Sequence, residues 1–560
     1  MLRKVTPQMK LRALLLATLA IPAAAQAKPA PVPVVAPVAL NQPALAEMVK
    51  TLSSDEFEGR SPGTAGEETT VAYLIERFKA AGLQPGNKGS WTQDVPTVEI
   101  TASNMAGLAI TGRASTMLFA PGKDFVAGSY RAIDRTAIAD AELVFVGYGI
   151  NAPELGWNDY AGVDMKGKVA VILVNDPDYE TATEDGPFKG RRMTYYGRWT
   201  YKFEEAARQG ARGALIVHDT FPAAYGWNVV ESSWTGPQYF VQRANKGMDQ
   251  TEANGWVQKG VAERILAAAG QDLGRLTQAA KARGFKPVPL GLKASLAFDN
   301  TMRTAMSKNV IGILPGKKRP DEYVLYTAHW DHLGRCKAAA DGDDICNGAV
   351  DNATGTAMLA AIAEANVKAG PADRSQVFLA VTLEESGLLG SEYYAANPVY
   401  PLAKTVGGVN MDALSPGSPS RDFQVVGGDK SELTRYVGAV TKAMGLTQSP
   451  ESDIERGYYY RSDHFSFAKR GVPMFNLGRG NDWVNGGKAA GEAAAKRYNE
   501  EAYHGPEDEF DPNWDWSGML QDGELFFRLG RSLAMTSDWP NWHPTDEFRA
   551  IRDQSRKGGK

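Results

Sequence analysis

Short apolar runs alternate with helical stretches and polar turns through the second half of the chain. The runs have the length and composition of buried strands and cover residues 309–314, 323–326, 377–383 and 405–410. Between them, helical spacing of apolar residues predicts helices over 355–367 and from 386 to 395. Such alternation favours an α/β fold, with a mixed sheet flanked by helices on both faces.

The first half of the chain has a different pattern. Helical periodicity covers residues 45–83, broken by the turn Gly59–Gly63. From residue 117 to 293, short β-rich runs alternate with Gly, Asp and Pro turns, and none of these runs ends in a group of His and acidic side chains. We therefore predict an inserted β-rich domain at 117–293 without catalytic residues, between two parts of one catalytic domain, 44–116 and 294–548.

Both ends of the chain differ in composition from the middle. Residues 1–27 combine a basic start, an apolar centre and the small-residue end Ala25-Gln26-Ala27, the pattern of a cleaved secretory signal peptide. The apolar centre is shorter than the roughly 20 residues that a membrane span requires. We therefore expect a secreted or periplasmic protein with no stable membrane insertion after signal removal. Residues 28–43 are rich in Pro and Ala, typical of an extended linker, and the composition of the polar tail 549–560 favours disorder.

The charge balance limits the possible partners. The chain has 61 basic and 65 acidic side chains, and residues 1–27 contain basic residues but no acidic one. A mature protein with this acidic balance argues against nucleic acid or an anionic membrane as the main partner. The two cysteines, Cys336 and Cys346, lie close together in the sequence. In an oxidising compartment we expect them to form a disulfide.

Residues with metal-binding chemistry follow several of the predicted strands. They are His329, Asp351, the adjacent Glu384 and Glu385, and Asp412. Ligands in open α/β sheets gather beyond the carboxyl ends of the strands, and carboxylates there are costly to leave without a cation. Mixed His and carboxylate ligands suit zinc, and two neighbouring metals need a bridging carboxylate. Asp331, two residues from His329, shares a face with it and is placed to support it.

Each acidic residue has a simpler explanation when taken alone. Asp351 suits a helix N-cap, the Glu384–Glu385 pair suits a solvated turn before a helix, and Asp412 suits a turn after a strand. What favours a metal site is the coincidence of four strand ends or exit loops in one predicted domain, each carrying a His or an acid. A carboxylate left free of the metal could then take a proton from a metal-bound water.

Several segments resemble the co-catalytic di-zinc aminopeptidases of metallopeptidase family twenty-eight. They are Thr327–Gly334 (TAHWDHLG), Gly348–Gly355 (GAVDNATG), Glu384–Ser391 (EESGLLGS), Asn410–Asp412 (NMD) and Leu52–Thr64 (LSSDEFEGRSPGT). The insert, with Lys166–Val169 (KGKV) and Gly210–Ile216 (GARGALI), is similar to a protease-associated domain. The resemblance implies a zinc-peptidase fold, two Zn²⁺ ions and peptide substrates.

The resemblance also implies individual roles for the polar residues. His329 and Asp412 would bind one zinc, and Glu385 and a distal histidine would bind a second. Asp351 would bridge the two ions. Glu384 would be the general base, and Asp331 would orient His329. The peptide bond after Asp351 is expected to be cis.

Two histidines are candidates for the distal ligand. The family places this ligand in a Tyr-His pair shortly before acidic residues, which matches Tyr503 and His504. The alternative is His464 in Ser462-Asp463-His464, a segment that in the family lines or supports the pocket. We therefore choose His504 as the ligand. Asp463, His464 and Tyr503 are expected to line or support the pocket, and His332 to lie beside the ligands or to be exposed.

These residues favour a zinc aminopeptidase that removes residues from the free N-terminus of peptides. A carboxypeptidase or dipeptidase on the same fold would need an arginine cluster at the pocket, for which Arg461 and Arg479 are too scattered. A catalytically inactive binding protein would have lost ligands, whereas every ligand position is filled here. Glutaminyl cyclisation on a related single-zinc scaffold is disfavoured by the second metal site. The oligomeric state is unknown from the sequence.

Overall fold

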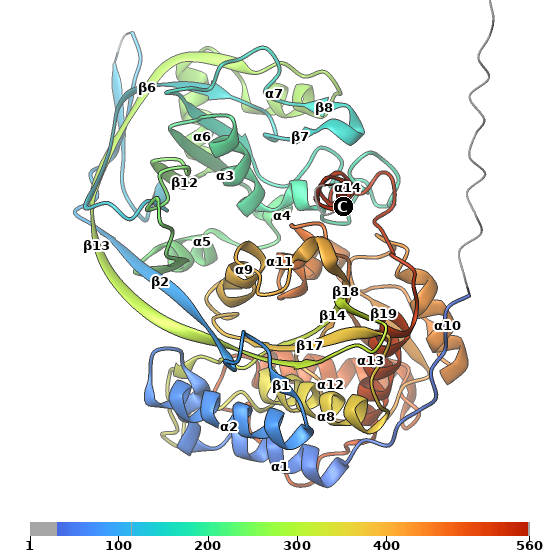
Figure 1. Cartoon of the computed structure of the whole chain (residues 1–560). Helices are drawn as coiled ribbons and strands as arrows, with labels where there is room; N and C mark the ends of the chain where they lie inside the picture. The colour runs from blue at the N-terminus through green and yellow to red at the C-terminus, as the bar shows by residue number, and fades with distance from the viewer. Residues whose placement is uncertain (1–30, 114, 558–560) are drawn as a thin grey trace, which may run out of the picture. The chain divides into compact units, whose positions relative to one another are not determined.

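The strands of the second half form one mixed sheet (Figure 1). In the computed structural model their order is β21–β18–β14–β17–β13, with bounds β13 Val288–Leu314, β14 Arg319–His329, β17 Arg374–Val381, β18 Thr405–Asn410 and β21 Met474–Phe475. Strands β14, β17, β18 and β21 run parallel, whereas β13 is antiparallel to β17. The structure confirms the predicted α/β fold with a mixed sheet.

Helices cover both faces of this part of the sheet. One face packs against α1 Gln42–Leu52, α2 Ala65–Ala81, α8 Gly355–Lys368 and α13 Ser517–Met535, and the other against α9 Leu389–Ala396 and α11 His464–Ala468. Because both faces are covered, β17 and β18 are buried at every residue, as is typical of parallel strands in α/β proteins.

The parallel pairing brings the carboxyl ends of three strands to one edge of the sheet. His329 is the last residue of β14 and pairs with Val381, the last residue of β17. Asn410, the last residue of β18, pairs with Thr327 near the end of β14. The chain therefore leaves all three strands into the same loop region, where ligands of open α/β sheets bind.

Residues 117–293 contain the β-rich segment that was predicted as an insert. Its strands continue the same sheet in the order β6–β9–β10–β12–β5, with bounds β5 Phe125–Gly128, β6 Arg135–Phe145, β9 Val169–Leu173, β10 Gly213–His218 and β12 Ala253–Gln258. The accompanying helices are α3 Trp199–Arg208, α5 Trp227–Trp234, α6 Lys259–Ala268 and α7 Leu273–Ala280. The domain boundaries themselves stay a prediction.

Two long strands join the two parts of the sheet. β13 has 27 residues and pairs with β6 through its first half and with β17 through its last residues. β2 Thr92–Ser103 pairs with β13 from Asp299 to Val310. Because the predicted boundary at residues 293 and 294 falls inside β13, backbone hydrogen bonds continue across it.

The described part of the chain contains further strands and α-helices. The strands are β1 Gln84–Pro85, β3 Leu108–Thr111, β4 Thr116–Phe119, β7 Asn151–Ala152, β8 Trp157–Asn158, β11 Pro237–Val241, β15 Gly334–Arg335, β16 Ile345–Cys346, β19 Asp422–Val425, β20 Thr447–Gln448 and β22 Leu477–Arg479. The helices are α4 Thr220–Ala223, α10 Thr434–Met444, α12 Gly487–Glu501 and α14 Arg549–Lys557.

The C-terminal tail is helical, so the disorder expected for it is wrong over residues 549–557. Arg552 in α14 is fully buried and donates hydrogen bonds to the carbonyl oxygens of Leu402 (3.1 Å) and Thr405 (2.7 Å). Arg556 lies over the ring of Trp539 at 4.0 Å. A polar, basic composition does not reveal these contacts because their partners are backbone carbonyls and a ring elsewhere in the sequence.

The structure describes residues 31–113 and 115–557. The predicted signal peptide, residues 1–27, lies outside the described residues. From Val32 onward the described chain forms one compact unit, and residues 31–41 contain neither helix nor strand. Within these described ranges, no helix has the length and apolar character needed to span a membrane.

Candidate metal centre

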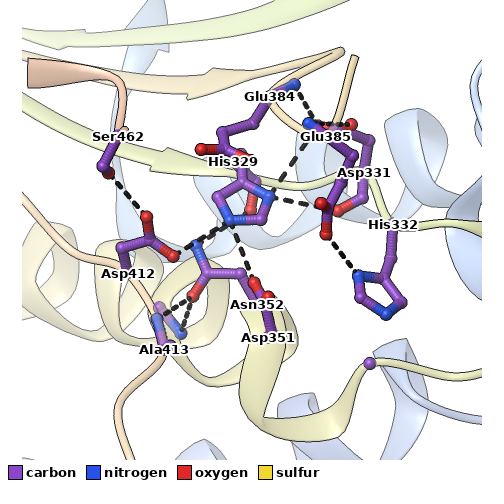
Figure 2. Close-up of polar contacts among 12 residues, drawn as sticks. His329, Asp331, His332, Asp351, Asn352, Glu384, Glu385, Asp412, Ala413 and Ser462 are labelled. Carbon is purple, nitrogen blue, oxygen red and sulfur yellow. Dashed lines mark hydrogen bonds and ion pairs between the residues drawn. The ribbon is translucent and has the colours of Figure 1, made fainter. Parts of the chain in front are cut away.

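Three ligating side chains converge at the end of β14 (Figure 2). His329 Nε2 lies 3.1 Å from Asp412 Oδ1 and 3.2 Å from Asp351 Oδ1. His329 ends β14, Asp412 follows β18, and Asp351 lies in the turn before α8. The side chains of His329 and Asp351 are buried, whereas that of Asp412 is 26% exposed. We refer to His329, Asp351 and Asp412 as the first triad.

A second group of ligating atoms shares Asp351 with the first. His504 Nε2 lies 3.4 Å from Asp351 Oδ2 and 3.2 Å from Glu385 Oε2. Asp351 thus directs Oδ1 toward His329 and Oδ2 toward His504. We refer to Asp351, Glu385 and His504 as the second triad. The structure therefore brings together the five residues that the sequence analysis chose as metal ligands.

The two triads fit the coordination chemistry of zinc. Imidazole nitrogens and carboxylate oxygens are zinc ligands, and donors about 2.1 Å from a tetrahedral ion lie roughly 3.4 Å from one another. The four donor pairs measured here are 3.1 to 3.4 Å apart. A carboxylate with one oxygen in each triad is the bridge that two adjacent ions need. The donor set therefore suits a pair of divalent ions.

The carboxylates give the centre a strong negative potential. Burial alone would lower the pKa of His329, but the charge of Asp412 and the hydrogen bond with Asp351 raise it well above its usual range. Burial also opposes protonation of His504, yet its hydrogen bonds with Asp351 and Glu385 raise the pKa to about 10. Carboxylates that stabilise a positive charge on both imidazoles in this way equally stabilise a bound cation.

Asp331 supports the centre through two different groups. Its backbone carbonyl is the group bonded to His329 Nδ1, at 3.1 Å, while its carboxylate Oδ1 is 3.8 Å away from that nitrogen. The carboxylate instead accepts the backbone N–H groups of Glu384 (3.1 Å) and Glu385 (3.4 Å). The main chain of Asp331 therefore orients the imidazole, and its buried carboxylate fixes the turn that carries the acidic pair. Burial raises the pKa of Asp331 to about 7.

Glu384 carries a carboxylate that belongs to neither triad. Its donor atoms lie within 4.8 Å of those of His329 and Glu385, so the side chain faces the centre. Burial, together with the charge of Asp412, raises the pKa of Glu384 well above its usual range, although His329 opposes this shift. A carboxylate with a raised pKa, next to a site where water would be activated, is suited to accept a proton.

The turn that carries Asp351 is held by residues distant in sequence. The Asp351–Asn352 peptide bond is cis. The Asp508 carboxylate accepts the backbone N–H groups of Val350 (2.9 Å) and Asp351 (3.0 Å). Asn352 Nδ2 donates to the carbonyl oxygen of His329 at 3.3 Å. These bonds fix the bridging carboxylate relative to the end of β14.

Arg60 is a supporting residue that the sequence analysis missed. It is fully buried and donates hydrogen bonds to the carbonyl oxygens of Leu52 (2.7 Å), Trp330 (2.8 Å), Asn347 (2.6 Å) and Gly348 (2.8 Å). Burial lowers its pKa to about 10. The guanidinium therefore joins the loop after β14 to the loop before the bridging aspartate. Arg60 lies in the segment Leu52–Thr64 that resembles the family, but neither the composition nor the spacing of this segment reveals that the side chain is buried.

The alternative distal histidine, His464, lies away from the ligands. It is fully buried, its Nε2 is 3.2 Å from Asn476 Nδ2, and its ring packs on Tyr459 with centroids 4.6 Å apart. Burial lowers its pKa to about 3. His504 instead stacks on Tyr503, with centroids 3.9 Å apart, and faces two carboxylates. The geometry thus favours His504 as the distal ligand.

The residues just before His464 support the first triad. Ser462 Oγ donates to Asp412 Oδ2 at 2.5 Å, so that Asp412 Oδ1 is left facing His329. Asp463 is fully buried, and burial raises its pKa to about 7. Ser462 and Asp463 therefore lie against the centre, but neither residue belongs to a triad.

Cys336 and Cys346 form a disulfide, with Cα atoms 5.9 Å apart. Cys346 Sγ lies 3.7 Å from the carbonyl oxygen of His504. The bridged loop therefore packs beside the second triad and against the backbone of its histidine.

The second half of the chain is similar to known proteins. Residues 309–528 match the model of Peptidase family M28. The mouse protein aminopeptidase NAALADL1 is 32% identical over 138 residues, which are 23% of this chain and 17% of that protein. The Caenorhabditis elegans glutamate carboxypeptidase 2 homolog is 32% identical over 130 residues, which are 22% of this chain and 15% of that protein. The matched region thus spans less than a fifth of the length of either relative.

Two solved structures are similar to this chain over most of its length. The aminopeptidase from Aneurinibacillus sp. strain AM-1 is 20% identical, covers 89% of this chain and 95% of its own, and has a TM-score of 0.47. The zinc aminopeptidase BSAP from Bacillus subtilis is 18% identical, covers 88% of this chain and 94% of its own, and has a TM-score of 0.40.

Proposed function

Because residues 309–528 match the model of Peptidase family M28, we propose that this protein is a zinc-dependent aminopeptidase that hydrolyses N-terminal residues from peptides. The observation that carries the proposal is the pair of triads joined by Asp351, with the carboxylate of Glu384 beside them. The mouse relative is named an aminopeptidase, in agreement with this reaction class.

Each residue of the centre would have its own role in peptide hydrolysis. When bound, two zinc ions would polarise the scissile carbonyl and lower the pKa of the attacking water. Glu384 would accept the proton from that water and pass it to the departing amine. The hydrogen bond from its backbone N–H to Asp331 keeps Glu384 in place during both transfers. Asp412 keeps one oxygen for the centre because Ser462 occupies the other.

Two carboxylates of the centre suit a substrate with a free amino terminus. Asp412 is 26% exposed, and Glu384 faces the centre without belonging to either triad. A protonated α-amino group of a peptide would form a charge-assisted contact with either carboxylate.

We also propose that the mature protein acts in the periplasm or outside the cell. The signal-peptide pattern of residues 1–27 supports this location. The Cys336–Cys346 disulfide agrees with it, because disulfides persist mainly in oxidising compartments. We propose in addition that residues 117–293 form a protease-associated domain, because Lys166–Val169 and Gly210–Ile216 are similar to segments of such domains.

The aminopeptidase proposal predicts hydrolysis that requires both a free amino terminus and zinc. Peptides of one sequence, with a free or acetylated N-terminus, are incubated with the purified protein before chelation, after chelation and after zinc is returned. Losing a charge-assisted contact of about 1.5–3 kcal/mol corresponds to roughly a 10- to 100-fold loss of kcat/KM, which we expect for the acetylated peptide. Chelation should abolish cleavage, and zinc should restore it. Equal cleavage of both peptides would contradict the N-terminal specificity, and activity after chelation would contradict the metal mechanism.

A second candidate function, recognition of the C-terminal carboxylate of short peptides, is favoured by one cavity. The cavity is lined by Arg198, Arg456, Arg461, Tyr225 and Glu455 among others. Arg198 Nε is buried and has no hydrogen-bond partner among the described residues. Burial and the neighbouring charge of Arg461 lower the pKa of Arg198 to about 10. A half-buried guanidinium with an unpaired Nε, beside a second guanidinium, would be stabilised by a bound anion.

The cavity is linked to the metal centre through the sequence. Arg461, which lines the cavity, directly precedes Ser462, whose hydroxyl donates to Asp412. Arg479, the other arginine singled out in the sequence, is buried and bonded to Asp522 at 2.9 Å. The Caenorhabditis elegans relative is named a glutamate carboxypeptidase homolog, which agrees with recognition of a carboxylate.

An Arg198→Met variant separates the two candidate functions. If the cavity binds the C-terminal carboxylate, KM for a dipeptide should rise about 10- to 100-fold, and KM for its C-terminal amide should stay unchanged. Arg191→Met, at an exposed position of the same loop, is the matched control and should leave both KM values unchanged. The carboxylate role is excluded if Arg198→Met changes neither KM or changes both equally.

A further inference from the structure

His332 lies beside the second triad and has no part in the mechanism described above. His332 was expected to lie beside the ligands or to be exposed, and the structure shows it buried, with 1% of its surface accessible. Its Nδ1 is 2.7 Å from Glu385 Oε1, and Figure 2 draws this contact as a dashed line. Its Nε2 is buried and has no hydrogen-bond partner in the described part of the chain. The ring therefore makes one polar contact, and that contact is with a proposed zinc ligand.

The two oxygens of Glu385 face different partners. Oε1 is engaged by His332, whereas Oε2 lies 3.2 Å from His504 Nε2 within the second triad. A carboxylate with both oxygens free can bind a metal through one or through both. The contact with His332 holds Oε1 beside the imidazole, so Oε2 is the oxygen that faces His504 within the second triad.

The contact also defines the protonation of the imidazole. An ionised carboxylate can only accept hydrogen bonds, so the proton of the contact must reside on Nδ1 of His332. This is the reverse of the frequent arrangement in which a ligating histidine is oriented by a carboxylate. Here a histidine orients a ligating carboxylate.

The surrounding backbone holds the ring in this place. A Cβ at Gly348 would lie 2.5 Å from Cδ2 of His332, and Gly348 has a φ of +54°. On another side, the ring of His504 packs edge-on with centroids 5.8 Å apart. The absence of a side chain at position 348 therefore leaves room for the imidazole against the second triad.

A different role, in which His332 is itself a metal ligand, fits the distances less well. Donor atoms of His332, Asp351 and Glu385 do lie within 4.8 Å of one another. However, two donors on one tetrahedral zinc would be roughly 3.4 Å apart. The 2.7 Å between Nδ1 and Oε1 is a hydrogen-bond distance instead.

We propose that His332 is a positioning residue that donates a hydrogen bond from Nδ1 to Glu385 Oε1 and so fixes Glu385 as a one-oxygen ligand of the second zinc. The inference rests on the proposed two-zinc function. The hydrogen bond from His332 should affect the zinc affinity of the second triad only. Glu385 belongs to that triad, and Asp351 is the one residue that the two triads share.

Zinc titration of the chelated protein, in competition with a chromophoric chelator, tests the proposal through two variants. His332→Leu removes the donor, and loss of such an outer contact weakens metal binding by about 10- to 100-fold, which we expect for one zinc only. His332→Asn places an amide N–H near the position of Nδ1 and should keep the affinity within a few-fold of the original protein. The thermal midpoint of each chelated variant is measured in parallel, to detect damage to the fold.

Three results would overturn the positioning role. Equal loss of the second zinc in both variants would show that the ring itself is a ligand. Unchanged zinc affinity in His332→Leu would show that the hydrogen bond has no effect on the metal. Weakening of both zincs, together with a lowered thermal midpoint, would show a structural role only. Because zinc binding is measured without substrate, failure of the peptide assays would contradict the proposed function and leave this test intact.

Discussion

Replacing Glu384 with glutamine is expected to lower turnover by about 10²- to 10⁴-fold, the usual contribution of a general base, while the protein keeps two zinc ions. Glutamine has the shape of glutamate but cannot accept the proton of the attacking water. The Glu384 carboxylate contributes to neither triad, and its backbone N–H bond to Asp331 does not depend on the side chain. Turnover is measured with a free-amine peptide, and the zinc content by elemental analysis of the same sample.

Glu385→Gln is the matched control for this prediction, because it makes the same chemical change at the neighbouring position. Glu385 belongs to the second triad, so this variant should lose one zinc as well as activity. Loss of zinc from Glu384→Gln would mean that Glu384 is a ligand, since its donor atoms also lie near those of His329 and Glu385. Near-normal turnover with two zincs would remove Glu384 from the proton transfer.

The ligands at the strand ends could be predicted because the pattern around them is local. His329 and Asp412 each follow an apolar run, and such runs identify buried parallel strands. Parallel strands in one sheet place their carboxyl ends at one edge, so the residues that follow them meet without further information. The sequence pattern could not give the pairing of His329 with Val381, because neighbouring strands are selected by tertiary packing.

Asp331 shows where local periodicity stops being informative. A spacing of two places side chains on one face only while the chain remains extended. β14 ends at His329, and the chain then turns. The carbonyl of Asp331 therefore meets the imidazole, and its carboxylate meets the N–H groups of the acidic pair.

Supporting residues distant in the sequence were the least predictable part of the site. Arg60 bonds the carbonyl oxygen of Trp330, which is 270 positions away, and Asp508 holds the backbone of Asp351 across 157 positions. Both are charged residues in polar, turn-rich segments, where exposure is the ordinary expectation. Their burial follows from backbone groups that have no other partner, and such groups are visible only once the chain is folded.

Replacing His504 with alanine is expected to reduce the bound zinc from two ions to one and to remove most of the activity. His504 supplies the only nitrogen of the second triad, at 3.2 Å from Glu385 and 3.4 Å from Asp351. Loss of a direct ligand should cost more than the roughly 10- to 100-fold in metal affinity typical of outer contacts. The first triad shares only Asp351 with the second and should keep its ion. Because the His504 side chain is 36% exposed, its removal should leave the fold intact.

His464→Ala is the control for this variant, and the two substitutions should have opposite effects. His464 is fully buried against Tyr459 and Asn476, so its removal should lower the free energy of unfolding by about 1–3 kcal/mol. The zinc content should remain two, because its contacts include no carboxylate of either triad. A stable His464→Ala protein with one zinc, beside a His504→Ala protein with two, would transfer the distal ligand to His464. Retention of two zincs in both variants would mean that the second ion does not depend on either histidine, which would contradict the second triad as a metal site.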